Sequence, residues 1–258
     1  MEQEYISDIF GERAILLGGI HGLVEYMFRD FNLNYNEDYS YNASVTYIVD
    51  TLSKKISSDG LLDIYLNLTV DKKLIFSEYY TKAYTISKPL FREIYNEVKS
   101  GNEIRSIMLN GNTEMTDISS SRMWKIPDKH SFRKSNRLMY NDEIKSSGLY
   151  IGCIMAQVDI LMENNHNNSE IINESIIEAV DSLNPYMLDK GISHMIDNCS
   201  TTARLGARKW APRLDYLLEQ NMCKSYNEYN YDYINKFVEH PIHSMFNQIR
   251  NINLNNKT

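Results

Sequence analysis

The 258-residue sequence predicts an all-α fold, and three observations support that class. Apolar residues recur at intervals of three and four through most of the chain, as they do along one face of a helix. Strand-type alternation is nowhere sustained. Glycine, proline and asparagine interrupt the apolar pattern where helices are expected to begin or end. The length suffices for one large domain or two small ones, with a sizeable core in either case.

The composition excludes several classes of protein. A net charge of −7 argues against a nucleic-acid partner, which would need a basic surface. No apolar run approaches the roughly 20 residues of a membrane span, and the acidic start MEQEY does not resemble a signal or transit peptide. Three cysteines are too few for a disulfide framework. We therefore expect a soluble protein of a reducing compartment, cytoplasmic or organellar, without a membrane partner.

The first half of the chain divides into predicted helices. One should cover 7–30, with Ser7 as its N-cap, and a second should cover 37–55 and stop near Gly60. Further helices are expected over 61–68, 71–84 and 88–100, the last with Pro89 in its first turn. Weak periodicity over 101–137 predicts a long connection. Helices should resume over 142–163, 169–184, 191–205, 212–220 and 231–248.

An internal repeat organises these helices. Residues 42–61 align without gaps on 173–192, and the same register carries Asn67 onto Asn198 and Thr69 onto Ser200. With a small shift, 17–20 falls on 151–154. The sequence thus predicts two fused copies of one helical unit within a single domain: a first repeat over 1–100, a connection over 101–137 and a second repeat over 138–258.

Two acidic pairs are the candidate functional residues. Asp8 and Glu12 stand four residues apart, as do Glu174 and Glu178, so each pair projects from one helical face. Four acids converging in one place would repel each other unless a hard cation such as Mg²⁺ bound them. The repeat sets other residues opposite these acids: Ala43 for Glu174, Tyr47 for Glu178, Asp142 for Asp8 and Ser146 for Glu12. Packing of the copies would therefore assemble one complete site.

Simpler interpretations remain open beside the metal site. An isolated acidic pair is usually a solvated helix face, although Glu174 and Glu178 stand among isoleucines. Glu163 and His166 have the ExxH spacing of di-iron bundles, but the flanking asparagines favour a helix end. His21 is better explained by packing or capping than by metal ligation.

Other motifs favour structural roles. The glycines at 18–22 lie within a predicted helix, with no strand before them, so they do not form a dinucleotide fingerprint. Ser200 lacks evident histidine and aspartate partners for a nucleophile. The basic residues at 122–137 are explained by a solvated loop better than by an anion site.

Several segments together resemble ketol-acid reductoisomerase in its long, plant-type form. They are SDIFGER at 7–13, SGNEIRS at 100–106, RMWK at 122–125, MAQVDIL at 155–161 and above all the block at 169–216, which includes NESIIEAVDSLNP and DNCSTTARLGARKW. The resemblance reaches to about residue 220. It implies a duplicated, knotted, all-helical C-terminal domain.

The resemblance also implies roles for single residues. Asp8 matches the aspartate that bridges two Mg²⁺ ions, Glu12 a ligand of the first ion, and Glu174 and Glu178 ligands on the side of the second. Ser200 matches the residue that binds the substrate carboxylate, and Glu178 is the expected proton shuttle. The matches to the substrate pocket are Leu16, Leu17, Leu183, Cys199 and Thr201.

The activity implied is Mg²⁺-dependent alkyl migration followed by NADPH reduction of 2-acetolactate or 2-aceto-2-hydroxybutyrate, a step to valine, leucine and isoleucine. The family's NADPH-binding Rossmann domain precedes the point at which Met1 stands, and no glycine-rich βαβ unit is recognisable here. A separate NADPH-binding domain and a homodimer are the expected partners. The alternatives are an inactive helical remnant or interaction module, and an isomerase that performs the migration alone.

Overall fold

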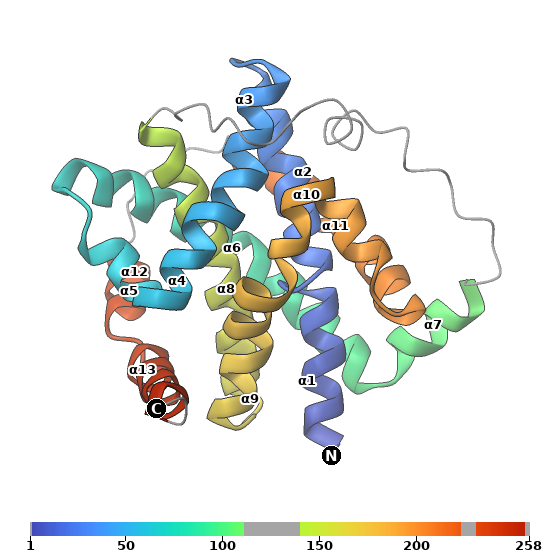
Figure 1. Ribbon diagram of the computed structural model, residues 1–258. Coiled ribbons are helices and arrows are strands. Elements are labelled where there is room, and N and C mark those ends of the chain that lie inside the picture. Colours follow the sequence, from blue (N-terminus) through green and yellow to red (C-terminus); the bar gives the residue numbers. More distant parts are fainter. Residues whose placement is uncertain (1, 111–139, 223–230, 256–258) are drawn as a thin grey trace.

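The computed structural model describes residues 2–110, 140–222 and 231–255 (Figure 1). Over these ranges every regular element is a helix, which confirms the predicted all-α class. One continuous apolar core runs through them, built from residues of both halves of the chain. No helix in the described ranges is long and apolar enough to cross a membrane.

The elements follow one another as short and long helices, some of them π-helical and labelled η. Up to residue 110 they are α1 (Glu2–Arg13), α2 (Gly18–Asn32), α3 (Glu37–Tyr41), η1 (Asn42–Thr46), η2 (Ile48–Ser53), α4 (Lys54–Asp59), α5 (Leu61–Leu66), α6 (Val70–Lys99) and α7 (Asn102–Asn110). From residue 140 they are α8 (Tyr140–Glu163), α9 (Asn168–Ile172), η5 (Asn173–Leu183), α10 (Pro185–Asp197), α11 (Thr201–Met222), α12 (Tyr231–Val238) and α13 (Ile242–Asn255).

Helices of the first half pack against helices of the second half. The long helix α6 of the first half packs along α8 of the second, and α2 of the first half packs along α11 of the second (Figure 1). Glycines allow these pairs to touch backbone to backbone. A Cβ on Gly22 would lie 2.4 Å from the Ala211 carbonyl oxygen, and one on Gly152 would lie 2.6 Å from that of Tyr80. Each half therefore completes the core of the other.

The backbone repeats with the aligned sequence. Residues 42–53 and 173–183 are both largely π-helical. Both stretches lead to a turn at a glycine with positive φ, 90° at Gly60 and 80° at Gly191. Asn67 and Asn198 then follow as helix C-caps with nearly identical angles. The predicted end of the second helix at Gly60 is thus confirmed, while the wider division into 1–100, 101–137 and 138–258 stays a prediction.

One part of the predicted register is wrong. In the register of the main repeat, Tyr80 corresponds to Ala211, and these residues touch Gly152 and Gly22 respectively. Gly22 therefore corresponds to Gly152, whereas the sequence alignment placed Gly18 there. Gly18 and Gly22 are one helical turn apart, and either can be aligned with Gly152. The sequence alone could not decide between these two alignments.

The first predicted helix is broken in the structure. Because α1 begins at Glu2, Ser7 lies inside it and is not an N-cap. Instead the Ser7 hydroxyl donates a hydrogen bond to the Glu170 carboxylate. A tight turn over 14–17 then separates α1 from α2. The sequence missed this break because the apolar spacing continues through it.

Prolines also misled the sequence-based prediction. Helix α6 runs unbroken through Pro89, which was expected to start a new helix. Pro89 removes one backbone hydrogen bond, but Phe91 and Ile94 beyond it are fully buried, and that burial offsets the loss. Helix α11 likewise continues through Pro212 from Thr201 to Met222, beyond the predicted bounds at both ends.

Three further boundaries differ from the prediction. Helix α7 stands inside the predicted connection, held by the buried side chains of Glu103 and Ile107; residues 111–139 lie outside the described ranges. The helix expected over 191–205 ends at Asp197, and residues 198–200 form a turn before α11. The last helix is two, α12 and α13, with Pro241 between them.

Candidate metal centre

Helix α1 lies directly against η5. A Cβ on Gly11 would lie 3.3 Å from the Glu174 carbonyl oxygen, so the two backbones touch there. One turn earlier, Ser7 bonds Glu170 at the start of the same helical stretch. Asp8 and Glu12 each follow one of these contact residues along α1. The acidic pair of α1 is therefore brought beside the acidic pair of η5, as the sequence predicted.

The acids perturb each other's pKa values. Burial raises the pKa of Glu12 to about 7; the Arg13 charge opposes that rise, and the charges of Asp8 and Glu178 add to it. Burial likewise raises the pKa of Glu174 to about 7, with further increases from the charges of Glu178 and Asp8. The four carboxylates therefore share one electrostatic environment although 166 positions separate Asp8 from Glu174.

The other two acids behave in the same direction. The pKa of Glu178 is raised by burial and by the charge of Asp8. That of Asp8 is raised by burial, against the lowering effect of Arg13. Burial and the charges of Glu12 and Glu178 also raise the pKa of the Cys199 thiol. Cys199 therefore borders the acidic cluster, and with it the turn that precedes α11.

The residues present fit a hard divalent cation. Glu174 Oε1 accepts a hydrogen bond from Asn173 Nδ2 at 3.0 Å, but Glu174 Oε2 is buried without a hydrogen-bond partner. A buried carboxylate oxygen without a partner is costly, and a cation would satisfy it. Within the described ranges, no three histidine, cysteine, aspartate or glutamate side chains already converge closely enough to hold an ion. The donors are thus neighbours whose oxygens do not yet surround one point.

Arg13 is a buried charge that the sequence reasoning missed. Its fully buried guanidinium donates to the Glu12 carboxylate, to Glu103 Oε1 at 3.4 Å and to the Thr202 carbonyl oxygen at 3.0 Å. Gly206 makes room for it, because a Cβ there would lie 2.4 Å from Arg13 Nε. Arg13 therefore joins the acidic pair of α1 to the start of α11. The one sequence feature that could have indicated this role is that Arg13 directly follows the candidate ligand Glu12.

The residues expected around a substrate divide into two groups. Ser200 and Thr201 are exposed at the start of α11, and Ser200 Oγ accepts from the Ala203 backbone N–H at 3.2 Å. Leu183 and Cys199 are partly exposed. Leu16 and Leu17, by contrast, are at most 1 % exposed and belong to the core beneath α1. The structure brings the first group to the surface near the acids and places the two leucines behind them.

Two histidines have structural partners. His166 Nε2 is 2.8 Å from the Tyr95 hydroxyl, and His166 Nδ1 is 3.1 Å from Glu170 Oε1. Glu163, the other member of the ExxH motif, instead pairs with Lys88 and Arg92 near the surface. His21 is buried on α2 within 3.6 Å of Glu25. The di-iron interpretation therefore has no support from the geometry.

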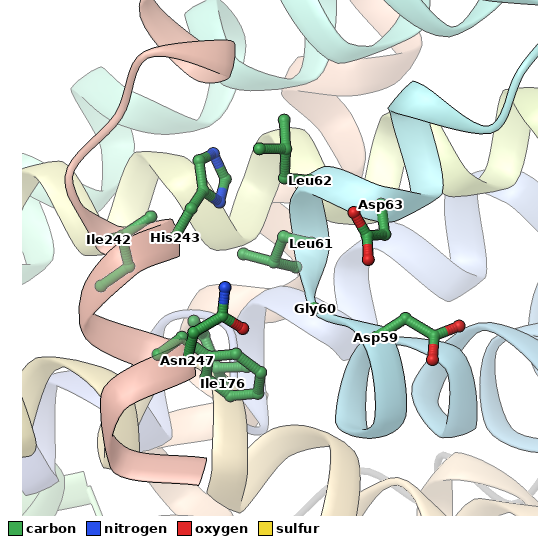
Figure 2. A pocket seen from close by; sticks show the side chains of 10 residues that line it. Asp59, Gly60, Leu61, Leu62, Asp63, Ile176, Ile242, His243 and Asn247 are labelled. Carbon is green, nitrogen blue, oxygen red and sulfur yellow. The ribbon is translucent and has the colours of Figure 1, made fainter. Parts of the chain in front are cut away.

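A small pocket lies elsewhere, between α13, the Gly60 turn and Ile176 of η5 (Figure 2). Its volume is about 40 Å³, room for little more than water. His243 and Asn247 face it from α13, and Asp63 lies on the opposite side (Figure 2). None of the predicted site residues lines this pocket. It is too small, and wrongly placed, to be the substrate site.

Fold and site together define a class: an all-helical domain that gathers acids from two distant helices beside a polar turn. The family model described as "Ketol-acid reductoisomerase, C-terminal domain" matches residues 1–141 and 146–257. The chain belongs to this family. The resemblance identified from the sequence motifs is thereby confirmed.

Individual relatives agree. Ketol-acid reductoisomerase, chloroplastic, of Spinacia oleracea is 44% identical over 94% of this chain and 43% of its own length. The Pisum sativum protein of the same name is 43% identical over 94% of this chain and 44% of its own length. Ketol-acid reductoisomerase (NAD(+)) of Desulfosudis oleivorans is 35% identical over 29% of this chain and 22% of its own. The chain thus spans less than half the length of the plant relatives.

Proposed function

We propose that this chain is the metal- and substrate-binding domain of a ketol-acid reductoisomerase, and that two Mg²⁺ ions bind through Asp8, Glu12, Glu174 and Glu178. One observation carries the proposal: α1 and η5 bring the two acidic pairs into one partly buried cluster, where burial first and the neighbouring carboxylates second raise the pKa values of Glu12 and Glu174. Family membership supplies the reaction class, since the relatives are named for it. The substrates would be 2-acetolactate and 2-aceto-2-hydroxybutyrate.

The residues of the chain would act on the substrate as follows. The Ser200 hydroxyl, exposed at the start of α11, would hold the substrate carboxylate. Glu178 would take the proton from the C2 hydroxyl as the alkyl group moves from C2 to C3 and would return it to the new C3 alkoxide. A second proton, drawn from solvent, would reach the C2 oxygen through the same carboxyl as the hydride reduces C2. The direction in which its pKa is shifted supports this role, because a carboxyl with an ordinary pKa holds almost no proton at neutral pH.

Other side chains would shape the surroundings of the substrate. Leu183, Cys199 and Thr201 would border it, while Leu16 and Leu17 would support α1 from the core. When bound, Mg²⁺ would polarise the ketone and stabilise the alkoxide, and a reduced nicotinamide would supply the hydride. The nucleotide-binding part would have to come from the same or another polypeptide. One relative is named for NAD(+), so NADPH and NADH both need testing.

The decisive experiment is oxidation of NADPH or NADH with 2-acetolactate and Mg²⁺. The chain is assayed alone and mixed with the nucleotide-binding domain of a plant relative. Turnover in the mixture and none with the chain alone would support the proposal. Absence of turnover in a mixture that demonstrably associates would favour an inactive remnant or interaction module. A rearranged product formed without nucleotide would identify an isomerase that performs only the migration.

Compartment and assembly belong to the same proposal. Among the described residues, Cys153 and Cys199 are free thiols, and burial raises the pKa of Cys153 to about 12. Such thiols suit a reducing compartment. We propose small acetohydroxy acids and a nucleotide-binding domain as partners, with a homodimer as the assembly to examine by light scattering.

A further inference from the structure

Gln157 occupies the junction of the two halves of the candidate metal centre. It stands in the middle of α8, in a run of apolar residues, and its side chain is fully buried. Its Oε1 accepts from the Ile15 backbone N–H at 2.9 Å. Its Nε2 donates to the Glu174 carbonyl oxygen at 2.7 Å and to Ser175 Oγ at 3.2 Å. One amide therefore spans the turn after α1 and the backbone of η5.

Each of these bonds meets a specific need. Ile15 lies in the turn between α1 and α2, where Leu16 N bonds the Gly11 carbonyl oxygen and Ile15 N turns to Gln157 instead. Without the glutamine, Ile15 N–H would be buried without an acceptor. Leaving such a donor buried and unpaired is unfavourable. The turn that ends α1, three residues after Glu12, is thus held by Gln157.

The other end of the amide acts on a proposed ligand residue directly. Nε2 bonds the backbone of Glu174, not its carboxylate, so Gln157 sets where that residue stands without competing for its charge. Gly11 fixes the closest approach of α1 to the same carbonyl oxygen. The Gly11 contact and the hydrogen bonds of the Gln157 amide together define the separation of α1 from η5. A divalent ion shared by both elements would be sensitive to that separation.

We propose that Gln157 is a positioning residue for the metal centre: its amide holds α1 and η5 at the spacing that lets Asp8 and Glu12 bind ions together with Glu174 and Glu178. This inference rests on the proposed function, because it presumes that the acids bind Mg²⁺. It adds a residue that carries no charge and touches no proposed ligand oxygen. It also assigns to α8, which bears none of the acids, a role in assembling the site.

The test is the Mg²⁺ affinity of the full chain, measured by isothermal titration calorimetry at a temperature at which circular dichroism shows each variant to be folded. Gln157→Met keeps the shape of the side chain and removes all its hydrogen bonds. Gln157→Asn, one methylene shorter, keeps the amide but cannot span both backbones, and serves if the first variant does not fold. We expect Mg²⁺ to bind roughly 10- to 100-fold more weakly to either variant.

Ser146→Ala is the matched control. Ser146 Oγ, also buried on α8, donates at 3.0 Å to the carbonyl oxygen of Ala43, the residue that corresponds to Glu174 in the repeat. Its loss removes a side-chain bond at the backbone position of η1 that corresponds to Glu174, where no proposed ligand stands. We expect lower stability and unchanged Mg²⁺ affinity. Equal weakening in Ser146→Ala would show a general packing effect and overturn the assignment.

The remaining outcomes separate the inference from the proposed function. If the unaltered chain binds Mg²⁺ and both Gln157 variants bind it equally well, the positioning role is wrong and the metal centre stands. If the unaltered chain itself binds no Mg²⁺, the metal centre is wrong and the role of Gln157 falls with it. A purely structural glutamine would lower the melting temperature without changing the affinity of the folded protein.

Discussion

The π-helical stretch η5 carries Glu174 and Glu178, whereas in the matching stretch of the first half Ala43 lies in η1 and Tyr47 lies between η1 and η2. Both residues of the first half are buried, and the Tyr47 hydroxyl lies 2.9 Å from Ser147 Oγ. In η5, one buried carboxylate oxygen of Glu174 has no hydrogen-bond partner. The Thr46 hydroxyl of η1 is also buried without a partner, so the difference is that the unpartnered atom of η5 belongs to an ionisable carboxyl.

This contrast separates fold from function within one molecule. The wide π-helical winding persists where the acids are absent, so it follows from how the two halves pack and not from metal binding. Single π-helical turns are often found at functional sites. Here the same π-helical backbone carries two acids of the candidate site in η5 and none in the matching stretch of the first half. The carboxylates, and not the winding, distinguish the stretch that contributes to the site.

Removing the carboxylates should produce the largest change. Glu174→Gln should weaken Mg²⁺ binding at one position roughly 100-fold, because a charged ligand is lost, and Asp8→Asn should weaken both positions. Calorimetric titration of each variant measures this. Tyr47→Phe, at the position matching Glu178, is the control and should bind as the unaltered chain does. Unchanged affinity in both acid variants would remove the metal centre.

The acidic cluster, to which both halves contribute, should make the stability of the protein depend on pH. Glu12 and Glu174 have folded pKa values of about 7 against an ordinary value of 4.5, so folding favours their protonated forms. Their contribution is therefore present below about pH 4.5 and is lost as pH rises through 7. In metal-free solution the loss should be on the order of 3 kcal/mol for each of the two groups at full burial, and less where solvent screens them.

Urea unfolding between pH 5 and 8, with chelator or with Mg²⁺, measures this loss. His243 acts in the opposite direction, because burial lowers its pKa. The informative quantity is therefore the difference between the unaltered chain and Glu174→Gln. That difference should grow with pH in chelator and shrink in Mg²⁺. A difference independent of pH would contradict the electrostatic account.

The two glycine turns should respond alike. Gly60 and Gly191 have φ of 90° and 80° with extended ψ, a region open almost only to glycine. Gly60→Ala and Gly191→Ala should each reduce the free energy of unfolding by about 1 to 3 kcal/mol. Ser58→Ala, on the exposed face of α4, should change it little and is the control. A loss at only one glycine would show that the two turns are not equivalent.

The smallest effect is expected at Tyr47, in the stretch that matches η5 but carries none of the four acids. Tyr47→Phe removes the bond to Ser147 and should reduce the free energy of unfolding by about 1 kcal/mol. Urea denaturation measures it. Because no carboxylate is involved, the reduction should be the same at pH 5 and pH 8. A pH-dependent reduction would indicate that this copy also contains a coupled acid.

Local patterns in the sequence predicted a large share of this protein. The helical class, the repeat of 42–61 on 173–192 and the end of the helix before Gly60 all follow from apolar spacing and glycine chemistry. The acidic pairs follow from spacing as well, since residues four apart share a helix face. The errors came where local signals conflict with burial, as at Pro89, whose missing hydrogen bond is offset by the packing of α6 on α8.

The assembly of the candidate site needed the tertiary structure. The sequence by itself determined which four acids stand in pairs, because helix geometry is set by neighbours in the chain. Only the fold decided that Gly11 touches Glu174, that Arg13 lies buried against Glu103, and that Gln157 connects the two elements. These contacts join residues 90 or more positions apart or lie on different helices, and no periodicity encodes them. They arise from the close packing of the two halves against each other.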